Sequence, residues 1–181
     1  MFNMDPAFTI IVSICMSLMF GFAAVHKLKA VTVFKATMDE YQLVPLMLSG
    51  VVAVLLIVAE LAAAILVLVP AVRTTGLMIM TVLLLIYAAG IGINLLRGRR
   101  DIDCGCSGPS SRHELSGWLV LRNLVLLSLV LLAAIPLAQR PMNWLDAVVV
   151  LFSVMVASGL YMGMNQLLAQ APRLAALRLS A

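Results

Sequence analysis

Two cysteines of the 181-residue chain, Cys104 and Cys106, flank Gly105 in its most polar stretch. Thiols two residues apart close a disulfide only in a tight, strained ring, and glycine best tolerates the backbone that such a ring needs. Strained disulfides are the more oxidising and labile ones. The spacing therefore favours a redox pair that exchanges disulfides over a permanent cross-link or two ordinary thiols in a glycine-rich turn.

The charged neighbours of this pair act in opposite directions. Four basic side chains would stabilise a thiolate, and two aspartates would oppose them. The basic residues are Arg99, Arg100, Arg112 and His113, and the acidic ones are Asp101 and Asp103. The sequence therefore supports thiolate chemistry without fixing the direction of the pKa shift.

Glu60 is the one acid deep within an apolar run, surrounded by alanines. A carboxylate at mid-bilayer costs roughly 3 kcal/mol on insertion scales, so it must be protonated, paired or beside water. One reading is a neutral, hydrogen-bonded Glu60 that locks helices together, and the other is a group that handles protons or binds a partner. Arg122 either snorkels to the surface or turns inward, to pair with Glu60 or support a thiolate.

Three further residues are supporting candidates. Cys15 lies within the first apolar run, where it either packs as a small hydrophobe or acts as a third redox thiol on the opposite side of the membrane. His26 and Lys27, followed by Lys29, close the same run. Cations there complement the dipole of a helix end, which is an alternative to a functional role.

The elements that position these residues follow from composition. The chain is 64% hydrophobic and 11% charged, with a mean hydropathy of +1.12, which predicts an integral membrane protein. Five apolar runs approach the ~20 residues that a membrane-spanning helix needs. They cover about 7–25, 46–69, 77–96, 118–137 and 144–168. The prediction is an all-α, polytopic bundle of about five transmembrane helices, four forming a core, with residues 1–181 as a single membrane domain.

Local patterns refine these boundaries. The first run has no basic leader before it and no small-residue cleavage site after it, so we expect it to be retained as a helix. Ser111 to Glu114 has the form of a capping box and predicts that the fourth helix starts near Ser111. Small residues at helical spacing predict close helix contacts. They are Ser13, Ser17 and Gly21 in the first run and Gly159 and Gly163 in the last.

Basic residues are distributed unevenly between the two membrane sides. With five spans, nine lie on one side and only Arg73 and Arg140 on the other. The nine are Lys27, Lys29, Lys35, Arg97, Arg99, Arg100, Arg112, Arg173 and Arg178. This excess predicts a cytoplasmic location for the side that carries Cys104 and Cys106, with the N-terminus outside and the C-terminus inside. The basic residues form no soluble stripe with interleaved aromatics, so no nucleic-acid partner is expected.

Both histidines fall on the same side as the cysteine pair. Cys104, Cys106, His26 and His113 could complete a tetrahedral zinc shell, although their spacing matches no standard zinc signature. A metal site is therefore the alternative to redox chemistry. No cofactor is predicted, and the sequence leaves quinone use undefined.

The order of several motifs resembles the MauE/DoxX-like family of redox-associated membrane proteins, and within it the methylamine utilisation (MauE) branch. The motifs are FAAVHKL at 22–28, YQLVP at 41–45, Glu60, INLLRG at 93–98 and DCGCSG at 103–108, and the resemblance covers roughly residues 7–137.

The resemblance implies a maturation factor in the bacterial inner membrane, connected with methylamine degradation. It implies two protein partners, a thioredoxin-like protein of the MauD type and the disulfide-rich beta (small) subunit of methylamine dehydrogenase, beside membrane lipid. Cys104 and Cys106 would be the exchanging thiols, and His26, Lys27 and Glu60 match family motifs. Whether the protein is itself an enzyme or an electron relay stays open, and a non-catalytic chaperone or docking scaffold is the alternative.

The implied substrate is periplasmic, whereas the charge distribution places the Cys-Gly-Cys stretch inside. Three arrangements resolve this conflict: a loop that folds back between the helices, a relay that accepts electrons from a cytoplasmic thioredoxin, or an inverted topology.

Overall fold

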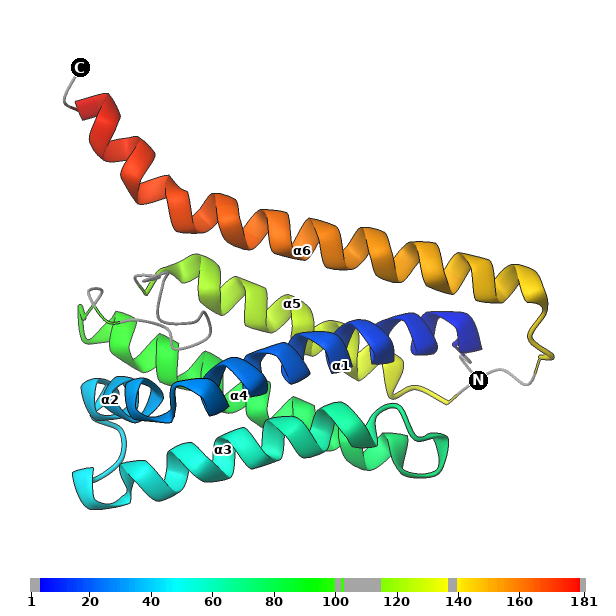
Figure 1. Ribbon diagram of the computed structural model, residues 1–181, viewed down its shortest axis with the longest axis horizontal. Coiled ribbons are helices and arrows are strands. Elements are labelled where there is room, and N and C mark those ends of the chain that lie inside the picture. Colours follow the sequence, from blue (N-terminus) through cyan, green and yellow to red (C-terminus); the bar gives the residue numbers. More distant parts are fainter. Residues whose placement is uncertain (1–3, 100–101, 103–114, 137–139, 180–181) are drawn as a thin grey trace.

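The computed structural model describes residues 4–99, 102, 115–136 and 140–179, and every regular element in these ranges is a helix. The elements are α1 (Pro6–Lys29), α2 (Val31–Tyr41), α3 (Leu46–Leu66), η1 (Pro70–Val72), α4 (Arg73–Leu96), α5 (Gly117–Ala133) and α6 (Trp144–Leu179). Figure 1 shows α1, α3, α4, α5 and α6 side by side with alternating direction, which confirms the predicted all-α bundle.

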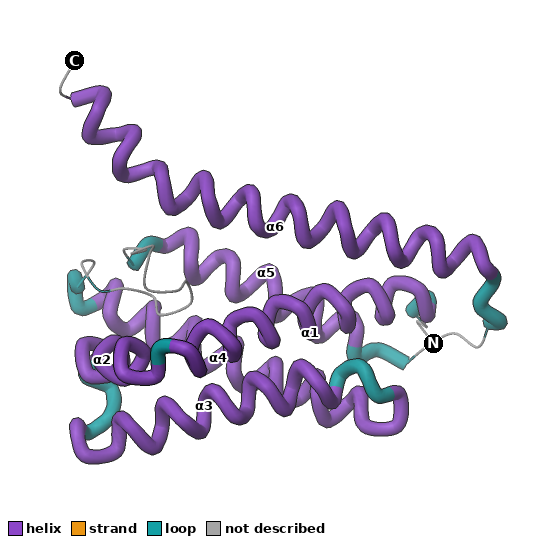
Figure 2. Tube along the Cα trace, in the orientation of Figure 1, coloured by secondary structure: helices purple, strands orange, loops and turns teal. Residues whose placement is uncertain are grey.

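The bundle has two distinct ends (Figure 2). At one end lies the short α2, together with the start of α3, the end of α4 and the start of α5; we term this the α2 end. The other end carries Asp5, η1 and the start of α6, and we term it the Asp5 end.

Four helices are long and apolar enough to cross a membrane: Pro6–Lys29, Leu46–Leu66, Pro70–Leu96 and the Trp144–Met164 part of α6. The fourth expected span, α5, is a shorter apolar helix of 17 residues. Its expected start near Ser111 is wrong, because Leu115 and Ser116 are not helical and Ser116 caps the helix in an extended conformation. Ser111–Glu114 themselves lie outside the described residues.

The helix α2 was not predicted, since an 11-residue segment between two spans reads as a loop. Its sequence is nevertheless amphipathic, with Phe34, Thr37 and Tyr41 on the buried side. It packs along α3, where Phe34 contacts Ala53 and Ile57. Gln42 ends it in the left-handed conformation, with φ of 50°.

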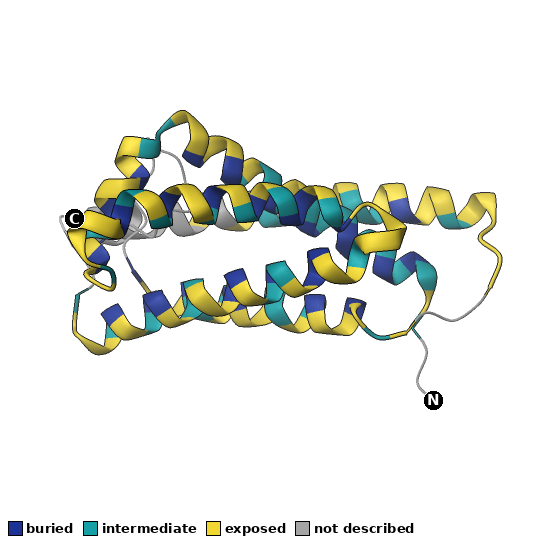
Figure 3. Cartoon of the chain, turned by 90° about the horizontal axis from the view of Figure 1, so that it is seen from below, coloured by how far each residue is buried: buried dark blue, intermediate teal, exposed yellow. Residues whose placement is uncertain are grey.

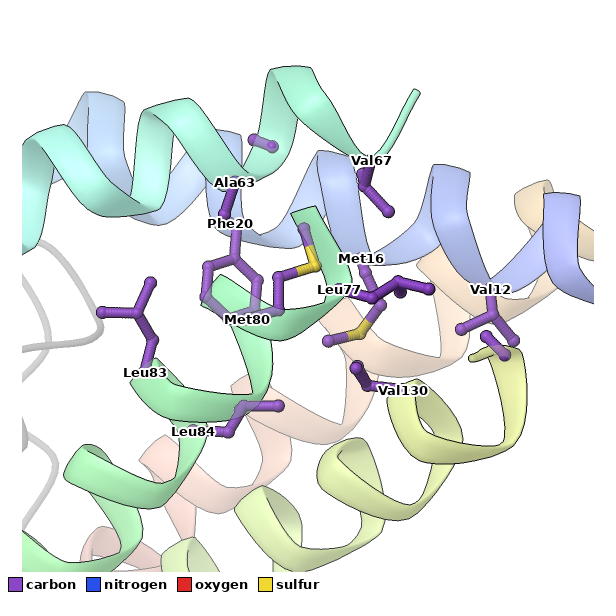
Figure 4. Packing of buried hydrophobic residues seen from close by; sticks show 12 residues of the cluster. Val12, Met16, Phe20, Ala63, Val67, Leu77, Met80, Leu83, Leu84 and Val130 are labelled. Carbon is purple, nitrogen blue, oxygen red and sulfur yellow. The ribbon is translucent and has the colours of Figure 1, made fainter. Parts of the chain in front are cut away.

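The apolar core lies between α1, α3, α4 and α5 (Figure 4). Met16, Phe20, Met80 and Val130 interdigitate there, each at most 4% exposed. The hairpin between α3 and α4 is especially tight, because a Cβ at Gly76 would lie 2.5 Å from the backbone nitrogen of Val67. Only glycine permits this approach without displacing the backbone.

The small residues of α1 and α6 behave differently. On α1, the Ser17 hydroxyl donates to the Ala64 carbonyl at 2.7 Å, and a Cβ on Gly21 would meet Ala64, so the predicted close contact forms with α3. The predicted contact at Gly159 and Gly163 is wrong for the residues that the structure describes, because among them a Cβ on either glycine would meet nothing within 4 Å.

The reason lies in the face that α6 presents to α1. Val150 is buried on that face. Gly159 follows it by nine residues, or two and a half helical turns, and therefore lies on the opposite side of α6. Only 6% of the α6 span is buried, against 33–39% of the other three spans (Figure 3). The outer side of α6 is therefore open.

Candidate functional site

Three polar side chains from three helices meet inside the bundle. Lys27 comes from the last turn of α1, Glu60 from α3 and Tyr87 from α4. The Lys27 ammonium and the Tyr87 hydroxyl both donate to Oε1 of Glu60, and Lys27 Nζ lies 3.2 Å from the Tyr87 hydroxyl. The side chains of Lys27 and Glu60 are only 4% and 1% exposed. We term these residues the Glu60 cluster.

Two aromatic rings enclose the ammonium group. Lys27 Nζ lies 4.7 Å from the centre of the Phe34 ring and 4.6 Å from that of Tyr87. Ring faces carry negative charge and attract a cation at this range, more strongly where water is excluded. Phe34 belongs to α2, so this short helix forms one wall around the buried charge.

The Glu60 cluster lies directly beside the apolar core, on the side of the α2 end. Ala63 and Ala64 of the core are one turn along α3 from Glu60, and Leu83 and Leu84 are one turn along α4 from Tyr87. The core therefore separates the cluster from the Asp5 end.

A second apolar cluster, which we term the anchor cluster, closes the bundle at the α2 end. It joins Tyr41 of α2 to Ile91 and Leu119, and to Ile102 and Leu115, which are 6% and 2% exposed. The Tyr41 ring packs on Gly90, where a Cβ would lie 3.5 Å from it. Ile102 and Leu115 border the segment that carries the cysteine pair, so both ends of that segment are fixed in the anchor cluster.

Buried amides occur at the same end. Asn94 and Asn123 are 0% and 4% exposed, and their side-chain amides donate to the backbone carbonyls of Gly90 and Leu119. Within the described part of the chain, the side-chain oxygen of Asn94 accepts no hydrogen bond, whereas its backbone carbonyl accepts from the Arg99 N–H. Asn94 lies two turns from Tyr87 on the same face of α4.

The structure brings together some of the residues that the sequence singled out. Lys27 lies against Glu60 in an ion-pair geometry, so Glu60 is not isolated in this arrangement. His26 is exposed, Arg122 is half-buried on α5, and Cys15 is half-buried in the part of α1 nearer the Asp5 end. Cys104, Cys106 and His113 lie outside the described residues, so their roles stay predictions.

The zinc alternative likewise stays a prediction. Over the ranges that the structure describes, no three His, Cys, Asp or Glu residues gather closely enough to hold a metal ion. Three of the four proposed ligands are not among those residues.

Sequence reasoning missed Tyr87 and Phe34. It also treated Lys27 as one of three cations at a helix end, whereas only His26 and Lys29 of these are exposed. The available signal was Glu60 itself, because a buried carboxylate requires a cation and hydrogen-bond donors. Lys27 was the lysine nearest to the interior of the first span.

A second charged cluster lies at the Asp5 end, and we term it the Arg140 clamp. The Arg140 guanidinium donates to both carboxylate oxygens of Asp5 at 3.0 Å, and to those of Asp146 at 2.8 and 3.1 Å. Asp5 also caps α1 by accepting from the Ala7 N–H. The hydrogen bonds from Arg140 and from Ala7 lower the pKa of Asp5, and both carboxylates raise the pKa of Arg140.

The chain was compared with known proteins and structures. Residues 5–139 match the sequence model of the family described as methylamine utilisation protein MauE. The MauE protein of Paracoccus denitrificans is 37% identical over 68% of this chain and 67% of its own length. That of Methylophilus methylotrophus is 34% identical over 67% of this chain and 64% of its own length. No solved structure matches.

The matched residues run from Asp5, the N-cap of α1, to just before Arg140, so they contain the Glu60 cluster and the anchor cluster, and α6 lies beyond them. The chain belongs to the MauE family of methylamine utilisation proteins.

Proposed function

We propose that this protein is a membrane maturation factor for the disulfide-rich beta subunit of methylamine dehydrogenase. It acts through thiol–disulfide exchange between the Cys104–Cys106 pair and a thioredoxin-like partner of the MauD type. The observation that carries the proposal is the anchor cluster, because burial of Ile102 and Leu115 holds both ends of the cysteine segment at the α2 end. Membership of a methylamine utilisation family supports the choice of pathway.

The exchange needs no further reactant. A thiolate of one cysteine attacks the partner's disulfide, one sulfur of which leaves and takes up a proton. The second cysteine then displaces the partner from the mixed disulfide. The pair ends as a disulfide and the partner as a dithiol, so two electrons and two protons have passed between them, and the reverse sequence reduces the pair.

The charge distribution supports a cytoplasmic α2 end in the inner membrane. Lys29, Lys35, Arg97 and Arg99 lie there, whereas Arg73 and Arg140 lie at the Asp5 end. Lys27 is excluded from this count because it is buried in an ion pair. In this orientation the pair receives electrons from a cytoplasmic thioredoxin, or is reached between the helices from outside.

The test is maturation of the dehydrogenase in cells that carry Cys104→Ser and Cys106→Ser together. We expect the beta subunit to lack its native disulfides, because the exchanging thiols are gone. Cys15→Ser is the matched control and is expected to leave maturation intact. Normal assembly in the double variant would contradict the proposal.

A membrane-impermeant thiol reagent tests the orientation. In the wild-type protein, reagent added to inverted vesicles should label Cys104 and Cys106 after reduction. Additional labelling from intact cells would indicate that the pair is also reached between the helices from outside. Labelling from the outside only would place the α2 end in the periplasm and reject the relay.

A further inference from the structure

The Glu60 cluster is charged, yet it is almost fully buried between three helices. Removing water from two ions is expensive, and the pair is tolerated only while each charge compensates the other. If Glu60 takes up one proton it becomes a neutral acid, and the Lys27 ammonium remains as an uncompensated buried charge. Such a charge does not remain in place when a route to water exists.

Lys27 has one such route, which leads past α2. It lies two residues before the end of α1, where Lys29 is exposed, and its long side chain can reach the surface by turning towards that end. The ring of Phe34, 4.7 Å from the ammonium, stands on the α2 side of the group. If Lys27 leaves, Phe34 loses the cation that its ring covers, and the packing of α2 against the bundle is weakened.

The position of α2 is in turn connected to the anchor cluster. Phe34 contacts α3 near one end of α2, and Tyr41 at its other end packs with Ile102 and Leu115. One short helix thus contacts both the buried ion pair and the two residues that border the cysteine segment.

The two sides of the Glu60 cluster differ in polarity. Towards the Asp5 end the apolar core closes the bundle, with Phe20 and Met80 at 4% and 0% exposure. Towards the α2 end lies Asn94, fully buried on the same face of α4 as Tyr87 and with a side-chain oxygen that no described donor reaches. A polar group therefore adjoins the cluster on the side of the α2 end, and apolar side chains adjoin it on the other side.

The charged and titratable groups around Glu60 come from each neighbouring element. Lys27 from α1 and Tyr87 from α4 contact Glu60 directly. The elements packed against these helices also carry the half-buried Asp39 and the buried Tyr41 on α2, and Arg122 on α5. Tyr41, Glu60, Tyr87 and Arg122 each make further interactions.

We propose that Glu60 is a proton-binding site, and that its protonation releases Lys27 and loosens α2 together with the anchors Ile102 and Leu115. The proton comes from water, Glu60 becomes a neutral acid, and Lys27 keeps its own proton and moves to the surface. Any effect of this protonation on thiol exchange by Cys104 and Cys106 rests on the proposed function, whereas the proton-binding site itself does not.

Amide hydrogen exchange of α2, followed by mass spectrometry on the full chain in lipid nanodiscs, tests this directly. After correction for intrinsic exchange, wild-type α2 should exchange about tenfold faster at low pH than at neutral pH, because loosening opens its amides. Glu60→Gln should exchange fast at every pH, and Lys27→Met with Glu60→Leu should exchange slowly at every pH. Glu40→Gln, on the exposed side of α2, should behave as wild type.

Two outcomes would overturn the proposal. The first is exchange in Glu60→Gln that equals wild type, and the second is a pH dependence that survives in the Lys27→Met, Glu60→Leu variant. If Glu60→Gln fails to fold, the second comparison decides alone. The protein with both Cys104 and Cys106 replaced by serine should keep the wild-type pH dependence, so failure of the thiol proposal leaves this one intact.

Discussion

The Glu60 cluster and the Arg140 clamp use the same chemistry in opposite surroundings. Each joins helices that are distant in sequence through a cation and carboxylates. The side chains of Lys27 and Glu60 are 4% and 1% exposed, whereas those of Arg140 and Asp5 are 38% and 50% exposed. One pair lies beside the apolar core and the other at a membrane surface.

The difference determines what each pair contributes. Water and salt screen the Arg140 clamp, so its energy is small, and it serves mainly to fix the start of α6 against α1. Nothing screens the Glu60 cluster, so its members depend on one another and its protonation has structural consequences. The exposure of the charged side chains, rather than the number of their hydrogen bonds, distinguishes the Arg140 clamp from the Glu60 cluster.

The largest effect is expected from Lys27→Met. The substitution keeps the length of the side chain but leaves the Glu60 carboxylate buried without its cation, which costs roughly 3–5 kcal/mol when one partner of a buried pair is removed. Unfolding in mixed detergent micelles measures the change. The control is Lys29→Met, two residues further along α1 and exposed, which should change stability little; equal effects at the two positions would contradict the burial argument.

A smaller effect is expected from Tyr87→Phe. The ring that packs on Lys27 is kept, and only the hydroxyl that donates to Glu60 is lost. A hydrogen bond to a charged group contributes about 2 kcal/mol. The same unfolding measurement applies, with Tyr161→Phe on the sparsely packed α6 as the matched control. A loss as large as that of Lys27→Met would indicate that the hydroxyl, not the ammonium, dominates the cluster.

A still smaller and salt-dependent effect is expected from Arg140→Gln. The Arg140 clamp is solvated, so its charges are screened within about 3 Å at 1 M salt. The thermal midpoint should fall slightly at low salt and match wild type at high salt, whereas the loss in Lys27→Met should persist. Arg73→Gln, at the same end of the bundle, is the control. A salt-independent loss in Arg140→Gln would remove the distinction between the two clusters.

The smallest effect concerns the pH dependence of the same clamp. Because the pKa of Asp5 is lowered below its ordinary value of 3.8, its charge stabilises the folded state above that value, and this contribution is lost as the pH falls through the lower folded pKa. Asp5→Asn keeps a good helix cap. The difference in thermal midpoint between wild type and Asp5→Asn should be constant near neutral pH and should disappear as the pH falls below 3.8. A difference that persists in stronger acid would exclude the ionised clamp.

Composition and hydropathy predicted the spans because lipid imposes strong, local constraints on a chain. Four long helices and one shorter apolar helix follow the expected runs. The same reasoning missed α2, because its 11 residues are too short and too polar to read as a span, and the helix lies against α3. The start of α5 was misplaced for a similar reason: Leu115 is buried in the anchor cluster, and no local pattern predicts that the chain remains non-helical there.

For the candidate site, the sequence indicated that Glu60 needs a partner but not which one. Lys27 and Tyr87 lie 33 and 27 residues away along the chain, and their meeting depends on how three helices pack. Gly159 and Gly163 have a spacing that is typical of close helix contacts. They nevertheless lie on the side of α6 that faces away from α1. Spacing identifies residues on one face, and only packing determines what that face contacts.

A double-mutant cycle on Lys27 and Glu60 tests the central claim most directly. The unfolding free energies of wild type, Lys27→Met, Glu60→Leu and the double variant are compared under one set of conditions. If the two charges depend on each other inside the bundle, the double variant loses less stability than the sum of the two single losses, with a coupling energy of about 2–3 kcal/mol. If the two losses simply add, Lys27 and Glu60 are independent and the account of the Glu60 cluster is wrong.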